Sequence, residues 1–137
     1  NIKLSFVNMG GKSNFNSKGV ESQVARLIKD YNFGDTVVIY CIDLDGYVSN
    51  SDQARENQII QEYITKNGFN LVWFCHDIEE VYDGKSVDKG DKTKMAMEFK
   101  KKGLIANLNE KQLRAKKEAK GTSNILDVLG KYLERAE

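Results

Sequence analysis

The sequence is poor in the residues that build zinc sites and disulfide scaffolds. It contains two cysteines, one histidine and no proline. A structural zinc ion usually has four cysteine or histidine ligands, so this class of site is close to excluded. Cys41 and Cys75 each lie in an apolar, strand-like stretch. This setting predicts reduced thiols in the core rather than a disulfide.

Long hydrophobic runs are also missing. No stretch approaches the roughly 18 apolar residues of a membrane-spanning helix, and the sequence shows no secretory signal. We therefore expect a cytoplasmic protein that does not enter membranes. The chain has 137 residues, 40% of them hydrophobic, which is enough for one domain with a core and too few for two.

Net charge is close to zero, but the charges are unevenly distributed. The chain carries a formal charge of +1, whereas residues 92–120 contain ten lysines and arginines against three glutamates, a local balance of +7. The rest of the chain therefore carries −6. This pattern predicts an acidic body with a basic segment near its end. The segment suits a nucleic-acid backbone, or it is simply a solvated helix face.

One stretch organises the rest of the chain. Residues 37–42 are apolar and mostly β-branched or aromatic, which is typical of a buried strand in a parallel sheet. The strand runs into Asp43, Leu44, Asp45 and Gly46. Side chains two residues apart on a strand point the same way, so both carboxylates are expected at the carboxyl edge of the sheet, where α/β folds bind ligands.

Periodicity along the chain predicts one α/β domain with a β-α-β-α-β core and C-terminal helices. Strands are expected at 2–7, 37–42 and 69–75, with amphipathic helices at 17–31 and 52–66 between them. Right-handed crossovers would make the sheet mostly parallel, with helices on both faces in three layers. The core covers about residues 1–84. Further helices are expected at 91–102, 110–120 and 124–136.

A second acidic cluster follows the strand at 69–75. It runs from His76 to Gly84 and reaches the same edge of the sheet as Asp43 and Asp45. Together with one of Asp77, Glu79 or Glu80, the two aspartates would form a carboxylate site for Mg²⁺ or Mn²⁺. Such ions activate water and stabilise charge on a phosphodiester, which suits chemistry on nucleic acids.

Lysines supply the candidate contacts to nucleic acid. Gly11-Lys12-Ser13 resembles the end of a phosphate-binding P-loop, but Phe6 stands where that motif needs glycine. A turn that exposes backbone N–H groups near the site is therefore expected instead. The four candidate nucleic-acid contacts are Lys12, Lys94, Lys116 and Lys117.

The Asp43-Leu44-Asp45 motif after a strand resembles the TOPRIM domain of topoisomerases, primases and related nucleases. The stretch from Asp35 to Tyr82 is similar to the RloB-like branch, in which an acidic residue follows the next strand. Glu79, after Ile78, takes that position here. The resemblance implies an Mg²⁺-dependent nuclease or phosphodiesterase, with Asp43, Asp45 and Glu79 as metal ligands and catalytic residues.

One departure from the TOPRIM pattern concerns the first strand. The family places a glutamate before a glycine at the end of that strand, as the acid or base of the reaction. Here Met9 precedes Gly10. Either the acid has moved to Glu79 or Glu80, or the domain binds metal or nucleic acid without cutting.

Two alternatives remain open. Residues 41–46 also resemble the first motif of haloacid dehalogenase phosphatases, which implies Asp43 as nucleophile and Asp45 as acid or base. Strand 69–75, however, ends in Cys75-His76 rather than serine or threonine, and no closing acidic pair follows. The other alternative is a non-enzymatic module that packs its terminal helix, 124–136, on a protein partner or a second copy.

Overall fold

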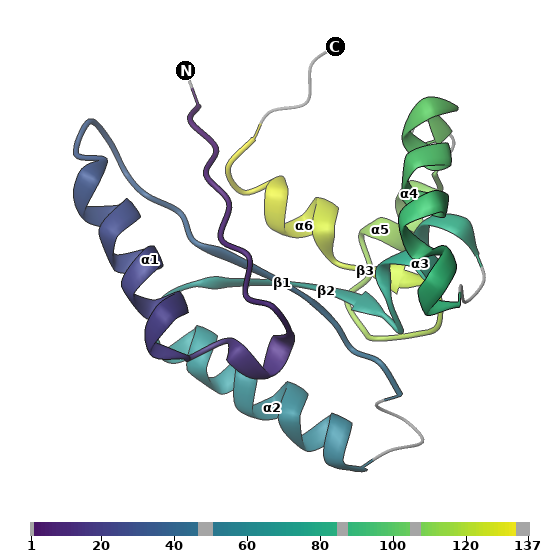
Figure 1. The fold of residues 1–137 in the computed structure, drawn as a ribbon, viewed down its shortest axis with the longest axis horizontal. Coiled ribbons are helices and arrows are strands. Elements are labelled where there is room, and N and C mark those ends of the chain that lie inside the picture. The colour runs from purple at the N-terminus through teal and green to yellow at the C-terminus, as the bar shows by residue number, and fades with distance from the viewer. Residues whose placement is uncertain (1, 47–50, 85–87, 105–107, 134–137) are drawn as a thin grey trace.

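A parallel pair of strands forms the centre of the fold. Strand β1 (Ile39–Asp43) lies beside β2 (Asn70–Cys75), with Ile39 opposite Asn70 and Asp43 opposite Phe74. Helix α2 (Ser51–Lys66) connects the two strands. The computed structural model, shown in Figure 1, describes residues 2–46, 51–84, 88–104 and 108–133. Both strands and the helix between them confirm the sequence predictions, although β1 begins at Ile39 rather than at Val37.

The sheet is smaller and less regular than predicted. A short third strand, β3 (Thr122–Ser123), pairs antiparallel with β2, and the order within the sheet is β1-β2-β3. The α/β class is therefore confirmed. The prediction of a mostly parallel sheet is not confirmed. The sheet is mixed and small, because the third strand is a two-residue antiparallel strand from the C-terminal part of the chain.

The predicted first strand, Ile2–Val7, is wrong. In the described part of the chain these residues pair with no strand, and Ile2, Leu4 and Phe6 are 68%, 74% and 89% exposed. The segment runs between α1 and α6 (Figure 1) and lines an open groove of about 1050 Å³ over β1. Alternation of apolar side chains is a local pattern, whereas a strand also needs a partner for its backbone N–H and C=O groups.

Whether residues 2–7 pack on the sheet can be tested by mutation. We expect Phe6→Ala to change the free energy of unfolding by no more than about 0.5 kcal/mol, because the ring is already in water. Phe33→Ala is the matched control, since Phe33 is 88% exposed. Urea denaturation measures both. A loss for Phe6→Ala well above that for Phe33→Ala would show that residues 2–7 pack against the sheet.

The remaining helices vary in how well they follow their predicted bounds. Helix α1 (Lys18–Asp30) begins where Ser17 Oγ accepts a hydrogen bond from the Val20 N–H at 3.2 Å, and α4 (Lys92–Lys101) matches its prediction. The predicted helix at 110–120 shrinks to α5 (Glu110–Leu113), and the last helix shrinks to α6 (Ile125–Leu129). Residues 134–136 of that last prediction lie outside the described part of the chain. The other elements are α3 (Ile78–Asp83) and the 3-10 turns η1 (Lys12–Asn14) and η2 (Lys89–Asp91).

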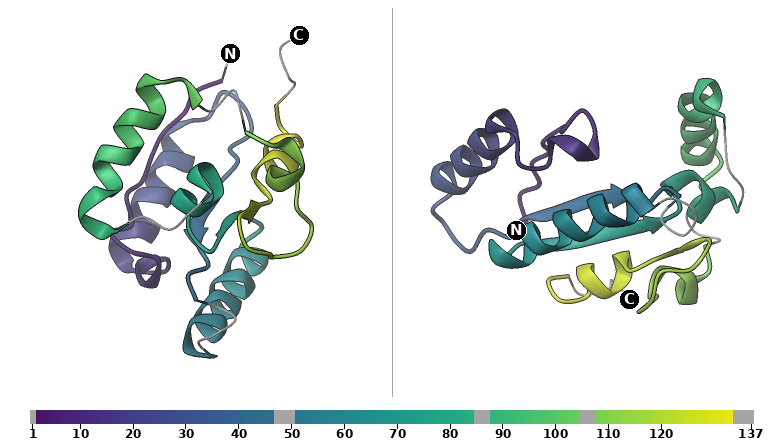
Figure 2. Two further views of the ribbon diagram at one scale, coloured as in Figure 1. Left: turned by 90° about the vertical axis from the view of Figure 1, so that its right-hand side faces the viewer. Right: turned by 90° about the horizontal axis from the view of Figure 1, so that it is seen from below.

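Helices cover both faces of the sheet, as Figure 2 shows. One buried cluster joins the sheet to α2 and includes Tyr40, Ile60 and Trp73. The other lies on the opposite face, where Val81 of α3 and Val128 of α6 pack with side chains of β2. Cys75 is fully buried, as predicted, but Cys41 is exposed, because the face of β1 that it occupies borders the open groove. None of the described helices is long and apolar enough to cross a membrane.

Candidate functional site: carboxylates at the strand ends

The carboxyl ends of β1 and β2 lie side by side. Beyond the regular strands, Leu44 N donates to the Phe74 carbonyl at 2.9 Å, and Asp45 N donates to the His76 carbonyl at 2.7 Å. The parallel pairing therefore carries the Asp43–Asp45 segment alongside the start of α3. This is the juxtaposition that the two acidic segments predicted from sequence.

The carboxylate of Asp43 reaches the first turn of α3. Asp43 Oδ1 accepts a hydrogen bond from the Ile78 N–H at 3.0 Å. Asp77 caps the helix by accepting from the Glu80 N–H at 2.8 Å, and Glu79 lies in the first turn. Acidic side chains suit this position because the N-terminus of a helix carries partial positive charge. We call Asp43, Asp45, Asp77 and Glu79 the carboxylate cluster.

Negative charge accumulates at Asp43. The pKa of this carboxyl is raised from 3.8 to about 6, chiefly by burial and also by the charges of Glu79, Asp45 and Asp77, while the hydrogen bond from the Ile78 N–H lowers it. A carboxylate that is partly desolvated among like charges is stabilised by a cation nearby. The Asp43 carboxylate is thus the position in the cluster where an added cation would relieve most repulsion.

Asp45 has a different partner from Asp43. Lys12 Nζ forms an ion pair with Asp45 Oδ2 at 2.8 Å and donates to the Asp43 backbone carbonyl at 3.0 Å. The sequence predicted that the two carboxylates point the same way. Asp45, however, adopts φ of 54°, in the left-handed region that aspartate tolerates better than most residues, so the strand periodicity ends before its side chain.

Glu79 is paired with a lysine that sequence analysis did not select. Lys92 Nζ, at the start of α4, lies 3.4 Å from Glu79 Oε2, and that oxygen is buried. Burial lowers the pKa of Lys92, but the charges of Glu79, Asp77 and Asp43 outweigh this effect and raise it. Lys92 lies within a lysine-rich stretch, so no local signal distinguished it from its neighbours.

Glu80 belongs to a separate pair. Its side chain is buried, and Oε2 accepts hydrogen bonds from the His76 backbone N–H at 2.7 Å and from the His76 ring, whose Nδ1 lies 2.8 Å away. These bonds and the charge of Lys120 hold the pKa of Glu80 below its ordinary value although burial pushes it upward. Glu80 therefore anchors the loop after β2 rather than joining the carboxylate cluster.

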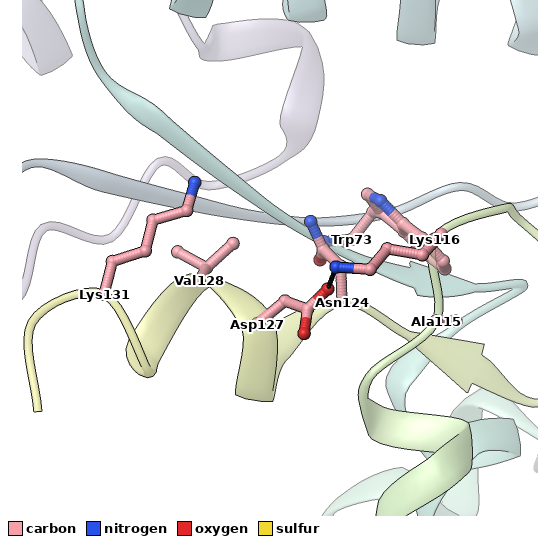
Figure 3. Close-up of a pocket in the computed structure, with 7 residues that line it drawn as sticks. All are labelled: Trp73, Ala115, Lys116, Asn124, Asp127, Val128 and Lys131. Carbon is pink, nitrogen blue, oxygen red and sulfur yellow. Dashed lines mark hydrogen bonds and ion pairs between the residues drawn. The ribbon is translucent and has the colours of Figure 1, made fainter. Parts of the chain in front are cut away.

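The structure brings one of the four predicted nucleic-acid contacts to the cluster. Lys12 lies there, whereas Lys94 is exposed on α4 and Lys117 is exposed between α5 and β3. Lys116 forms an ion pair with Asp127 on the far side of β2 from β1. The two residues line a pocket of about 320 Å³ with Trp73 and Asn124 (Figure 3). No member of the carboxylate cluster lines that pocket.

Asn57 is the other contributor that the sequence did not reveal. Its Nδ2 donates to the Leu44 carbonyl at 2.9 Å, and its Oδ1 accepts from Lys12 Nζ at 2.9 Å. An asparagine in the middle of an amphipathic helix has no distinctive spacing. Only the packing of α2 beneath the Asp43–Asp45 segment gives it a role.

A full set of protein ligands for a metal ion is not assembled here. Among the residues that the structure describes, no three histidine, cysteine, aspartate or glutamate side chains form a metal-binding group. Comparison of the chain with protein-family models, curated proteins and solved structures found no match.

Proposed function

We propose that this chain acts on or binds nucleic acid at the carboxylate cluster, with Mg²⁺ or Mn²⁺ as its cofactor, in the manner of a TOPRIM-like domain. One observation carries the proposal: the Asp43 carboxylate, at the end of a parallel strand, meets the acidic first turn of α3 through the 3.0 Å bond from Ile78 N–H. This edge of an α/β sheet is where such folds bind ligands. Burial of the Asp43 carboxylate among like charges supplies the reason for a cation.

The oxygen donors fit Mg²⁺ chemistry. Magnesium is commonly bound through one or two carboxylates, with water and substrate phosphates as its other ligands, so a three-residue protein cage is not required. Asp43 and Glu79 are the residues that would hold the ion: Asp45 is engaged by Lys12 at 2.8 Å, and Glu79 would give up its longer, 3.4 Å ion pair with Lys92. When bound, the ion would neutralise charge on a phosphodiester and lower the pKa of a bound water.

The helix that supplies Lys92 to the cluster also carries exposed lysines. Helix α4 stands out at the end of the molecule that carries α3 (Figure 1), and Phe99 stacks on Tyr82 of α3 with a centroid distance of 5.5 Å. Lys94, Lys100 and Lys101 are exposed on this helix. Exposed lysines that are not neutralised bind a phosphate backbone by releasing its counterions, which makes such binding salt-dependent.

Metal binding is the first test. We expect calorimetry to show Mg²⁺ or Mn²⁺ binding to the native chain and loss of that binding in Asp43→Asn, because the substitution removes the charged ligand but keeps an oxygen for Ile78. Asp30→Asn, an exposed aspartate at the end of α1, is the matched control. Equal affinity in the native chain and Asp43→Asn would refute the metal site.

Nucleic-acid binding and cleavage are tested next. Single- and double-stranded DNA and RNA are titrated with the native chain at two salt concentrations, in Mg²⁺ and in EDTA. Binding that weakens with salt and with charge removal at Lys94 supports the proposal, whereas no binding at low salt contradicts it. Cleavage that depends on Asp43 would identify a nuclease. Binding without cleavage would identify the degenerate form that the missing glutamate at Met9 suggests.

A phosphatase of the haloacid dehalogenase type is the second candidate. The contacts of Lys12 Nζ with the Asp43 backbone carbonyl and the Asp45 carboxylate favour it, since an ammonium beside the aspartate pair suits a phosphate group. The hypothesis requires Asp43 as nucleophile. Beryllofluoride and Mg²⁺ together should then bind to the native chain and not to Asp43→Asn, a result that the nuclease hypothesis does not require.

The binding-module alternative has less support. It requires an apolar face on the terminal helix that lacks a partner, but α6 packs on the sheet. Val128 is buried against the side chains of β2, and Tyr132, after the end of α6, donates from its Oη to Asn70 Oδ1 at 3.0 Å. A protein partner or a second copy remains a proposal, and sedimentation of the native chain over a range of concentrations tests the second copy.

A further inference from the structure

The ammonium group of Lys12 occupies a ready-made cation position. Its Nζ lies 3.0 Å from the Asp43 carbonyl, 2.9 Å from Asn57 Oδ1 and 2.8 Å from Asp45 Oδ2. Glu56 Oε1 is a fourth oxygen at 4.0 Å, and the lysine side chain is only 12% exposed. A carbonyl, an amide oxygen and two carboxylates are the hard donors that divalent cations use in proteins.

The surrounding backbone and side chains build this position. The Asn57 amide is fixed by its bond to the Leu44 carbonyl, which turns its oxygen toward Lys12. On the other side, Gly10 and Gly11 have φ of 73° and 135°, values that favour glycine, and this turn brings the chain to Lys12. Phe15, at the end of the same turn, is buried in the cluster with Tyr40, so the turn is held against the sheet.

We infer that Lys12 is a built-in counter-cation that takes the place of a second metal ion at this site. Phosphodiester chemistry often uses two divalent ions about 3.5–4 Å apart. Here the singly charged ammonium would replace one of the two cations, at Asp45, and leave Asp43 and Glu79 for a single divalent ion. The expectation of one bound ion in the native chain rests on the proposed function. The expectation that removing the ammonium adds one ion rests only on the oxygen atoms around Lys12.

The test counts bound ions rather than activity. The full-length chain is titrated with Mn²⁺, and free Mn²⁺ is measured by electron paramagnetic resonance. We expect the Lys12→Ala variant to bind one more ion per chain than the native protein, because shortening the side chain empties a position lined by oxygens. Lys18→Ala, an exposed lysine at the start of α1, should leave the number unchanged.

Two further variants keep the inference falsifiable. Lys12→Gln preserves most of the side-chain packing and adds an amide oxygen, so it should also bind one ion more than the native protein. This variant provides the test if Lys12→Ala does not fold. Adding Asp45→Asn to either variant should abolish the extra ion. The same number of ions in the native chain, Lys12→Ala and Lys12→Gln would overturn the inference.

Failure of this inference differs from failure of the proposed function. No ion in the native chain and one ion in Lys12→Ala would support the role of Lys12 and refute the metal site at Asp43. One ion in both would support the metal site and refute the role of Lys12.

Discussion

Replacing Ile60 with alanine is expected to lower the free energy of unfolding by about 2–5 kcal/mol. Ile60 lies on the inner face of α2 and is 0% exposed, in the cluster that includes Tyr40, Ile42 and Trp73. The substitution removes three carbon atoms from a site with no solvent access. It therefore loses both their transfer free energy and the contacts across the cavity that remains.

The preceding residue provides the control for this prediction. Ile59 is on the same helix and 47% exposed, so Ile59→Ala makes the same chemical change without opening a buried cavity. We expect its cost to be well below that of Ile60→Ala, while helix propensity changes equally in both. Urea denaturation measures the free energy of unfolding of both variants, and the slopes of that free energy against urea concentration are compared. Equal losses would mean that α2 does not pack on the sheet through the Ile60 face.

The same helix shows why part of the fold follows from sequence. Ile60, Tyr63 and Ile64 have helical spacing within a helix of 16 residues, and the strand that follows, β2, is apolar from Leu71 to Cys75. Apolar residues at this spacing predict a helix, because any other local structure would expose part of the apolar face to water. The β1-α2-β2 unit was therefore predictable, and with it the meeting of Asp43 and the acidic stretch after Cys75.

The other parts depend on partners that are distant in sequence. Leu4 and Phe6 alternate as a strand does, but their local pattern contains no information about whether β1 accepts them as a neighbour. β3 is polar and two residues long, so only its position beside β2 identifies it. The contact of Lys12 with Asn57 spans 45 positions and depends on the packing of α2 beneath the strand end.

Asp43→Asn should make the chain more stable at neutral and alkaline pH in the absence of divalent ions. Folding raises the pKa of Asp43 from 3.8 to about 6, so the folded state pays for ionising this carboxyl while the unfolded state does not. The cost is absent below pH 3.8, grows as pH rises and is complete above about pH 6. A pKa shift of this size lowers the free energy of unfolding by at most about 3 kcal/mol. Because the carboxyl is partly exposed, we expect a loss of about 1–2 kcal/mol.

The measurement is urea denaturation of the native chain and Asp43→Asn in EDTA at pH 4 and pH 8. We expect the stabilities to agree at pH 4 and the variant to be more stable at pH 8, because asparagine can still accept the Ile78 hydrogen bond but carries no charge. Asp30→Asn, at an exposed position, should show no such pH-dependent gain. A native chain more stable than Asp43→Asn at pH 8 in EDTA would show that the Asp43 charge is already compensated.

Adding Mg²⁺ then connects stability to function. An ion that binds only the folded native chain stabilises it in proportion to the logarithm of the ion concentration, whereas Asp43→Asn gains nothing. The difference between the two proteins at pH 8 should therefore shrink and reverse as Mg²⁺ is added. Burial of the Asp43 charge among like charges destabilises the chain without the ion and favours ion binding, so both effects must disappear together in the variant.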